Sequence, residues 1–383
     1  MSADDLVRLL AFCTARREWL VETTTALAGL ESPTPDKAAV DRCGRDLARR
    51  LGALGAAVDS VESTATGNHL RAAFGAGDGQ LLLLGHFDTV WPVGQVGRMP
   101  VRRDGGRLYG PGVFDMKAGI AIGMLAASAA GELGYQLRRR VVMLLTADEE
   151  RGSGASRALV EAEARRSAAV LVLEPSLPGG SVKTQRKGAG EFELTIGGIA
   201  AHAGLEPEKG ASAISELAAQ IAALDRLADP ARGVTVNVGL VDGGSRPNVV
   251  AERARAVVDV RVATAADAER MHAAIHALQP GSPGTSVTVR GGFSRPPLER
   301  TAAVARLYEL AREVAHGLGR DLGEGAAGGG SDGNFTAALG VPTLDGLGAV
   351  GDGAHALHEH VDVDALPWRA ALVAGLMRRL DAA

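Results

Sequence analysis

The sequence predicts an α/β protein of two domains, the larger of which is built on a mostly parallel sheet. Three runs that are apolar on both faces are typical of buried strands: Leu81–Leu84, Val141–Leu145 and Val170–Leu173. Between the first two, Met116–Leu133 carries Ala, Met and Leu at helical spacing. This strand–helix–strand order favours parallel strands covered by helices. At 383 residues the chain is also longer than one hydrophobic core usually supports.

A second domain is predicted to be inserted into the first, because the pattern changes near Lys187. From there the predicted elements are strand 191–196, helix 211–227, strands 234–240 and 253–262, helix 266–278 and strand 286–290. The order β-α-β-β-α-β is that of a ferredoxin-like split βαβ unit. We therefore expect residues 188–298 to form an inserted α+β domain. Residues 1–187 and 299–383 then form the main domain.

The flanks of the main domain are predicted to be largely helical. Residues 5–55 are helical in pattern, with a break at Ser32–Pro35. After the inserted domain, a helix over 301–318 and a loop over 323–334 lead into a tail that returns to the main domain. Glycine-rich motifs resume in this last part of the chain, where close-approach loops are needed.

Composition and charge exclude several classes of protein. Apolar residues make up 46% and charged residues 22%, and the net charge is −4, so neither nucleic acid nor an anionic membrane is expected as a partner. The two cysteines, Cys13 and Cys43, cannot build a disulfide framework or a cysteine-based zinc site. The start of the chain lacks the pattern of a secretion signal, and no apolar run approaches a membrane span. We therefore expect a cytoplasmic location.

The first candidate for function is the segment Gly85–Val90, which directly follows the run of four leucines. Side chains two apart on a strand point the same way. His86 can therefore offer a ring nitrogen to a metal while Asp88 supports the ring from behind. Because His-x-Asp also occurs by chance, the weight of this pattern depends on the segments that follow.

Three further acidic segments also lie at element ends. Asp115 stands at the entry to the Met116 helix, where it could bind a metal or simply cap the helix. Asp148–Glu150 follows a buried strand, and three successive acids repel one another there unless a cation neutralises them, although a solvated acidic turn is the alternative. Glu174 ends the third buried run. Sites in such sheets form at the carboxyl ends of strands.

A fifth segment, 353–360, adds three histidines in a glycine-containing loop. Histidine and carboxylate ligands without thiolate suit Zn²⁺, and also Co²⁺ or Mn²⁺. Two ions held by two histidines and three carboxylates, one of them bridging, would polarise a carbonyl and acidify a shared water. One carboxylate must stay uncoordinated to carry the proton to the leaving nitrogen.

In order and spacing, these five segments resemble those of the dinuclear zinc aminoacyl hydrolases that include glutamate carboxypeptidase, acetylornithine deacetylase and succinyl-diaminopimelate desuccinylase. The segment Gly85–Pro92 is most similar to the glutamate carboxypeptidase-like branch. The resemblance covers nearly the whole chain. It implies a zinc-peptidase-type catalytic domain and identifies the inserted domain as a dimerisation or lid domain.

The resemblance also implies roles for individual residues. Five would bind two Zn²⁺ ions: His86, Asp115, Glu150, Glu174 and a histidine of the 353–360 loop. Asp115 would bridge the ions, with His86 and Glu174 on one of them. Glu149 would be the general base, and Asp88 would orient His86.

The histidine of the last loop has three candidates. In the family the ligand stands four or five residues before an acid, and His355 stands four before Glu359. His355 is therefore the preferred ligand. His358 and His360 remain alternatives, or are solvated loop residues.

Substrate contacts are implied mainly in the inserted domain. His202 resembles a histidine that reaches the active site of a second subunit and donates to the oxyanion of the intermediate. Asn248 and Arg261 resemble carboxylate-binding residues, and a guanidinium suits bidentate recognition of a carboxylate. An ordinary surface salt bridge is an equal alternative for Arg261. Gly330 and Ser331, in a glycine-rich loop, would line the substrate pocket.

Together these features predict a homodimeric dizinc amide hydrolase. The predicted activity is that of a carboxypeptidase releasing a C-terminal amino acid such as glutamate from a small peptide. An N-acyl-amino-acid deacylase with the same metal site is the nearest alternative. A catalytically silent metal- or ligand-binding homologue is less compatible with a free base at Glu149. A dinuclear phosphoesterase would need phosphate-binding loops, and the sequence has no convincing one.

Overall fold

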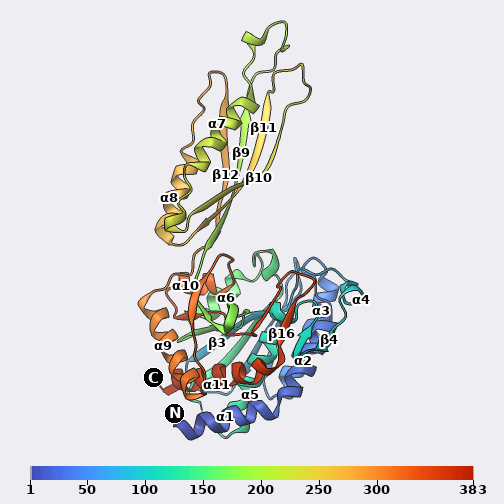
Figure 1. Ribbon diagram of the computed structural model, residues 1–383, viewed down its shortest axis with the longest axis vertical. Helices are drawn as coiled ribbons and strands as arrows, with labels where there is room; N and C mark the ends of the chain where they lie inside the picture. The colour runs from blue at the N-terminus through green and yellow to red at the C-terminus, as the bar shows by residue number, and fades with distance from the viewer. Residues whose placement is uncertain (1, 136, 383) are drawn as a thin grey trace. The chain divides into compact units, whose positions relative to one another are not determined.

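The computed structural model describes residues 2–135 and 137–382, which form two units (Figure 1). The first unit comprises residues 1–185, 299–327 and 331–383, and the second comprises 186–298 and 328–330. The chain thus enters the second unit two residues before the expected boundary at 188 and leaves it at 298. Each unit has its own sheet and its own hydrophobic core.

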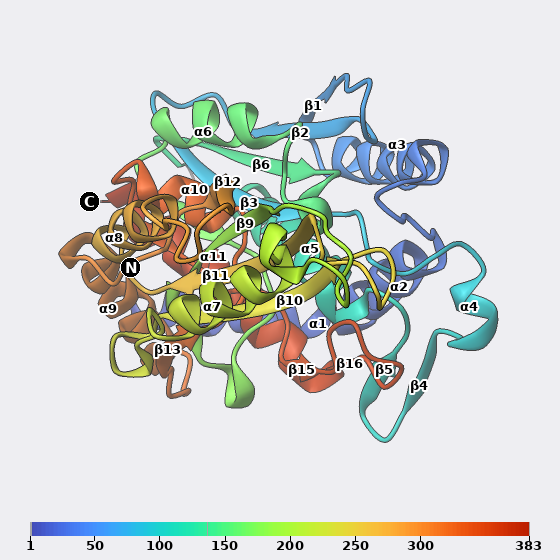
Figure 2. The same cartoon turned by 90° about the horizontal axis from the view of Figure 1, so that it is seen from above.

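The first unit is built on a six-stranded sheet in the order β1-β2-β6-β3-β7-β14. Its strands are β1 (Ala57–Val61), β2 (His69–Phe74), β3 (Gln80–His86), β6 (Arg140–Thr146), β7 (Val170–Val172) and β14 (Thr343–Leu344). Strands β6, β3, β7 and β14 are parallel, whereas β2 pairs antiparallel with β6 and β1 pairs antiparallel with β2. Figure 2 shows β1, β2, β6 and β3 following one another across the sheet. The predicted mostly parallel sheet is therefore confirmed.

Strand β3 is buried on both faces, as its run of leucines predicts. Leu81 and Leu83 belong to the larger hydrophobic cluster of this unit. Leu82 and Leu84 belong to a second cluster on the opposite face. Because neighbouring side chains point to opposite faces, a continuous apolar run is required wherever both faces are covered. This burial fixes the register of β3 and hence the position of His86 at its end.

Helices cover this sheet and extend beyond it. They are α1 (Ala3–Ala15), α2 (Arg17–Gly29), α3 (Lys37–Ala53), α4 (Gln95–Arg98), α5 (Ala118–Glu132), α6 (Arg157–Arg165), α9 (Ala302–Gly317), α10 (Gly333–Ala338) and α11 (Leu366–Ala382). Helix α5 packs against α2, α11 and β3. A Cβ at Gly119 would lie 2.0 Å from the carbonyl oxygen of Leu173, so only glycine lets α5 approach the end of β7 this closely.

One segment differs from the expectation about membrane spans. Val113–Glu132 is long and apolar enough to cross a membrane by length and composition. However, 89% of its apolar window is buried inside the protein, because α5 is a core helix that is apolar on every side.

Smaller sheets complete the first unit. Strands β4 (Arg102–Asp104), β5 (Arg107–Tyr109), β15 (Gly351–Asp352) and β16 (His360–Asp362) form a sheet in the order β15-β16-β5-β4. Strand β8 (Val182–Arg186) pairs with β13 (Glu324–Ala327). The pairing of β16 with β5 brings the C-terminal histidine loop next to the segment that leads to Asp115.

The second unit has the predicted ferredoxin-like order. Its elements are β9 (Gly188–Gly197), α7 (Ala213–Asp225), β10 (Thr235–Gly243), β11 (Arg253–Val262), α8 (Ala265–His276) and β12 (Ser286–Arg295). The sheet order is β10-β11-β9-β12, with every pair antiparallel. On β9, alternate side chains such as Phe192 and Leu194 are buried. They share a core with Leu224 of α7 and Met271 of α8, so both helices cover the same face (Figure 1).

Candidate metal centre

The predicted ligands meet at the carboxyl edge of the parallel part of the sheet. Strand β3 lies between β6 and β7 and runs parallel to both. His86 is the last residue of β3 and pairs in register with Thr146, the last residue of β6. Glu149 follows β6, and Glu174 follows β7. Three neighbouring strands therefore deliver a histidine and two carboxylates to one place.

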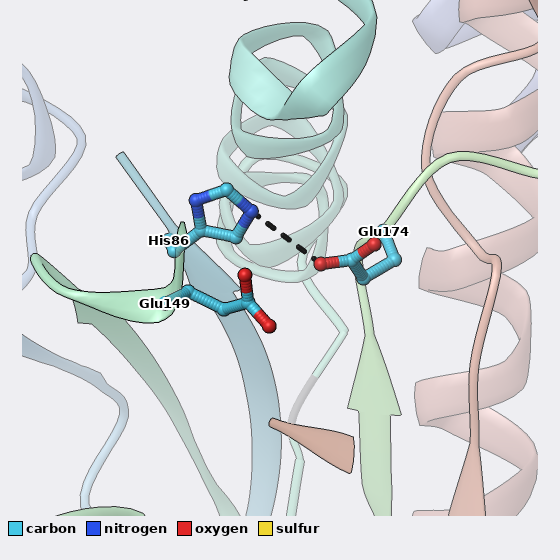
Figure 3. A group of neighbouring side chains, drawn as sticks. All are labelled: His86, Glu149 and Glu174. Carbon is cyan, nitrogen blue, oxygen red and sulfur yellow. Dashed lines mark ion pairs between the residues drawn. The ribbon is translucent and has the colours of Figure 1, made fainter. Parts of the chain in front are cut away.

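His86 is held with one nitrogen towards the protein and the other towards the acids. Its Nδ1 lies 3.1 Å from the carbonyl oxygen of Asp88 and 3.4 Å from the Asp88 carboxylate. Its Nε2 lies 3.2 Å from Asp115 Oδ1. The same nitrogen lies 3.4 Å from Glu174 Oε1 (Figure 3). If Nδ1–H donates to the Asp88 carbonyl, the lone pair of Nε2 faces the acids, as a metal ligand requires.

Asp115 joins two clusters, because its two oxygens face different histidines. Oδ1 approaches His86, whereas Oδ2 lies 3.3 Å from Nε2 of His355. The same nitrogen of His355 lies 3.3 Å from Glu150 Oε2. This arrangement of one carboxylate between two histidines matches the bridging role that the family resemblance implies for Asp115.

The pKa values reflect this crowding of opposite charges. Burial opposes the charged form of His86, but its contacts with Asp115, Asp88 and Glu174 outweigh burial and hold its pKa well above the ordinary value. Contacts with Asp115 and Glu150 raise the pKa of His355 to about 10. Burial would raise the pKa of Asp115, but the two histidines lower it. The carboxylates therefore favour positive charge on the two histidines, and the histidines favour negative charge on Asp115.

The donor set fits a pair of divalent cations. Ligand atoms of His86, Glu149 and Glu174 lie within 4.8 Å of one another, as do those of His86, Asp115 and Glu150. Figure 3 shows the carboxyl groups of Glu149 and Glu174 next to the His86 ring. Glu150 Oε1 is buried and makes no hydrogen bond to any residue that the structure describes, and burial raises the pKa of this carboxyl group. A buried acceptor without a donor, among this many acids, is what a cation would satisfy.

The acidic turn separates its three carboxylates by direction. Asp148 folds back, and its Oδ2 accepts from the amides of Ala155 at 2.7 Å and Ser156 at 3.3 Å. Glu149 groups with His86 and Glu174, whereas Glu150 groups with His86 and Asp115 and also contacts His355. One sequence triplet thus supplies a turn-stabilising residue, a candidate base and a candidate ligand.

Asp88 also holds the acidic turn in place. Its carboxylate accepts from the backbone amides of Glu149 and Glu150, both at 3.2 Å, and from the Thr34 hydroxyl at 2.7 Å. It is fully buried. Asp88 therefore ties the histidine strand to the acidic turn, so that the candidate base and His86 keep a fixed relation.

Three supporting residues have no role in the sequence prediction. Thr34 reaches Asp88 from the break between α2 and α3. His69 accepts the Ala147 amide at Nδ1, 3.1 Å away, and burial lowers its pKa. Asp332 accepts from the Thr146 hydroxyl at 3.0 Å and from the Ser153 hydroxyl. Each lies far in sequence from the turn it supports, so no local pattern could identify it.

The structure places the three histidines of the last loop differently. His355, with φ of 63° and a half-exposed side chain, is the one that approaches Asp115 and Glu150. His360 is buried, and its ring packs against Tyr109 at 5.2 Å between centroids. His358 is exposed, and its carbonyl accepts from His360 Nδ1.

The candidate substrate residues lie mainly in the second unit. His202 and Asn248 are exposed on neighbouring loops, where the Ala203 amide donates to the Asn248 carbonyl at 3.0 Å. The guanidinium of Arg261 contacts the carboxylate of Asp259 at 2.8 Å, which is the surface salt bridge considered as its alternative role.

The glycine-rich loop is divided between the two units. The carbonyl of Gly330 accepts from Arg186 at 3.0 Å within the second unit. Ser331 belongs to the first unit and is fully buried, with its hydroxyl donating to Asp345 at 2.5 Å. The backbone of Ser331 is also engaged, because its amide donates to Asn334 Oδ1 at 2.9 Å and its carbonyl accepts the Asn334 amide at 3.0 Å.

This combination of an α/β unit, an inserted antiparallel unit and a carboxylate–histidine centre defines a class of metallohydrolase. The sequence profile of Peptidase family M20/M25/M40 matches residues 82–379. The chain therefore belongs to this family, and it is a metallopeptidase or amidohydrolase with a candidate metal site.

Individual relatives agree with this assignment. Carboxypeptidase G2 of Pseudomonas sp. (strain RS-16) is 30% identical over 371 residues, covering 95% of this chain and 89% of the relative. Succinyl-diaminopimelate desuccinylase of Burkholderia ambifaria is 30% identical over 367 residues, covering 89% and 93%. Among solved structures, aminopeptidase PepT of Bacillus cereus has a TM-score of 0.83 at 24% identity, covering 95% of this chain and 98% of that chain, which shows the shared fold.

Proposed function

We propose that this protein is a dizinc carboxypeptidase that releases a C-terminal amino acid such as glutamate from a small peptide or conjugate. The observation that carries the proposal is Asp115, whose two carboxylate oxygens face His86 and His355. The similarity of the whole chain to carboxypeptidase G2 supports the choice of a carboxypeptidase. Zn²⁺ is proposed from the donor set, which Co²⁺ or Mn²⁺ also suits.

The residues divide into two ligand groups around the shared carboxylate. His86, Asp115 and Glu174 would hold one ion, whereas Asp115, Glu150 and His355 would hold the other. When bound, such a pair polarises the scissile carbonyl and lowers the pKa of water. The remaining steps depend on side chains that do not need to coordinate.

Glu149 is the proposed carrier of the proton. The acidic turn holds its carboxylate beside His86, and Asp88 fixes that turn through the Glu149 amide. From this position Glu149 can accept a proton from the attacking water and return it to the leaving nitrogen. The amide substrate is thereby cleaved into an acid and a free amine.

Substrate contacts are proposed to come from the second unit. Arg261 and Asn248 would bind the α-carboxylate of the released amino acid. His202, from a second copy of the chain, would donate to the oxyanion. For Arg261 this requires exchange of its present partner Asp259 for the substrate carboxylate, which a half-exposed surface pair permits at small cost.

A second candidate is an N-acyl-amino-acid deacylase. The desuccinylase relative supports this candidate, because it is 30% identical to the chain, as carboxypeptidase G2 is. Both reactions release an amine from an amide by the same chemistry. They differ in which side of the amide carries the recognised group.

The test is a substrate panel on the zinc-reconstituted protein. Folate-like conjugates ending in glutamate, dipeptides, and N-acetyl and N-succinyl amino acids are compared by release of free amino acid. We expect release from the C-terminal glutamate conjugates, abolished by a chelator and restored by zinc. Preferential cleavage of N-acyl amino acids would establish the deacylase instead. Chelator-insensitive release, or release from no member of the panel, would refute the proposed function.

A further inference from the structure

A buried carboxylate beneath the metal centre, Glu359, is used by none of the roles above. It is fully buried, four residues after His355. Its Oε2 accepts from the amide of Gly112 and from Trp91 Nε1, both at 2.9 Å. Its Oε1 accepts from the amides of Phe114 at 2.9 Å and Asp115 at 3.0 Å. All four donors are N–H groups, so both oxygens must act as acceptors.

These bonds connect the segment of Asp115 with the segment of His355, two proposed ligands that are 240 residues apart in number. One donor is the backbone of Asp115 itself, and two others belong to the segment just before it. On the other side, Glu359 ends the turn that carries His355, with the Glu359 amide donating to the Ala356 carbonyl at 2.9 Å. The backbone carbonyl of Glu359 also accepts the Gly110 amide at 3.3 Å.

We propose that Glu359 is a positioning residue that sets the distance between Asp115 and His355, and thereby completes the second metal position. The proposal rests on the two-ion site of the proposed function. Asp115 Oδ2 and His355 Nε2 are 3.3 Å apart, yet their backbones belong to segments 240 residues apart in number. The Glu359 side chain hydrogen-bonds the segment of Asp115, whereas Glu359 itself belongs to the segment of His355. His86 and Glu174 are delivered by β3 and β7 instead, so the first position depends on Glu359 only through the shared Asp115.

The substitution Glu359→Gln tests this directly. An amide of the same size can accept at its oxygen but presents N–H groups at its other end, where two N–H donors already point. We expect the second Zn²⁺ to bind 10- to 100-fold more weakly, which is the usual effect of losing a residue that orients a metal ligand. The first Zn²⁺ keeps His86 and Glu174, so its affinity should fall by less than that of the second. Both steps are measured by calorimetric titration and by metal analysis after gel filtration.

Glu163→Gln is the matched control. Glu163 is also a buried carboxylate of the first unit, bonded to Arg71 at 3.1 Å and Gln80 at 2.9 Å. Gln80 starts β3, whereas His86 ends it, so Glu163 lies at the opposite edge of the sheet. Glu163→Gln should lower the melting temperature but leave both zinc affinities unchanged. The combination Glu359→Gln with His355→Ala should lose no more zinc than His355→Ala alone.

The outcomes separate this proposal from the function on which it rests. Uptake of only one ion by the unsubstituted protein would overturn both. Two ions in the unsubstituted protein, with equal weakening of both ions or no weakening in Glu359→Gln, would overturn only the role of Glu359. If Glu359→Gln does not fold, Trp91→Phe removes a single donor. It should then weaken the second ion by a few-fold and the first by less, and an equal effect on both would contradict the proposal.

Discussion

At the scale of the residue, Asp148–Glu150 shows how neighbouring identical charges acquire different tasks. Asp148 accepts backbone amides of its own turn, whereas Glu149 and Glu150 point to different clusters. The backbone of the turn is held in place, because the Asp88 carboxylate accepts the amides of both glutamates. The fixed backbone of this turn sets the directions of the two glutamates, which the proposed division into a base and a ligand requires.

Replacing Glu149, the proposed base, should separate metal binding from catalysis. Glu149→Gln keeps the size of the side chain and its backbone amide bond to Asp88 but removes proton transfer. We expect hydrolysis to fall by about 10²- to 10⁴-fold. Zinc content and melting temperature should stay close to those of the unsubstituted protein. Hydrolysis within a few-fold of the original, at equal zinc content, would exclude Glu149 as the base.

Residue patterns in the sequence were sufficient to single out the groups that the structure brings together. His86, Asp115, Glu150, Glu174 and His355 each stand at the end of a predicted element or in a predicted loop, so their chemistry is visible locally. Thr34, His69 and Asp332 are not visible in this way. They act through contacts with segments that only the fold brings near, and a threonine or histidine on its own carries no such information.

At the scale of the element, the strands that are buried on both faces are the ones that the sequence predicts. The strands β3, β6 and β7 are apolar on both faces and were predicted. The strands β1 and β2 were not, because β1 is mostly exposed and β2 carries Arg71 and a histidine within its six residues. Helix α11 was assigned only as a tail, although most of its residues are buried. A helix covered on several sides lacks the one-sided pattern that identifies an amphipathic helix.

Helix α11 anchors the loop beside Glu174 through a buried arginine. Arg369 donates to the carbonyls of Gly348 at 2.7 Å, Gly180 at 2.8 Å and Gly346, and burial lowers its pKa to about 9. Arg369→Met would leave these carbonyls without their donor, so we expect the free energy of unfolding to fall by about 3 kcal/mol. Urea denaturation measures this change.

The control for Arg369 lies on the same helix. Arg379 forms an exposed pair with Glu313 at 2.8 Å, and Arg379→Met should change the free energy of unfolding by less than about 1 kcal/mol. Equal effects of the two substitutions would show that the buried carbonyl bonds of Arg369 do not stabilise the loop.

Helix α7 carries a pH-dependent contact in the second unit. Glu216 is buried, and although burial opposes its charge, bonds from the Gly281 amide, Gln220 and Ser282 lower its pKa to about 2, from an ordinary 4.5. Because the folded pKa is the lower one, the stabilisation is complete above pH 4.5. It disappears as the pH falls towards 2, and its upper limit is about 3 kcal/mol.

Glu216→Gln removes this charge and should flatten the acid limb of the stability curve. Above pH 5 the variant should be the less stable protein, and the difference should shrink as the pH falls. Melting temperatures between pH 3 and pH 7 measure it. A difference that is constant with pH would mean that the Glu216 charge does not contribute.

At the scale of the whole molecule, the second unit presents an open sheet edge. Strand β10 is at the end of its sheet, and Leu240 and Val241 on it are 63% and 58% exposed. Unpaired edges with exposed apolar side chains favour pairing with another chain. This edge supports the proposed homodimer, in which His202 would reach a second active site.

Leu240→Lys should therefore shift the protein from dimer to monomer. A charge on an edge strand opposes strand pairing. Light scattering after gel filtration measures the mass, and Val7→Lys, at a 64% exposed position on α1, is the control. If the Leu240 variant has the same mass as the control, β10 is not the dimer contact.

The way in which the second unit is joined to the chain makes the molecule modular. The amide of Arg186 donates to the carbonyl of Leu298 at 2.9 Å, and the Leu298 amide returns a bond at 3.0 Å. The strand that leaves the first unit and the strand that returns to it are thus already paired. A short turn joining Arg186 to Leu298 could replace everything between them while retaining all five proposed ligands. Such a miniature chain would be a metal-binding scaffold without the proposed carboxylate-binding residues, onto which other recognition domains could be grafted.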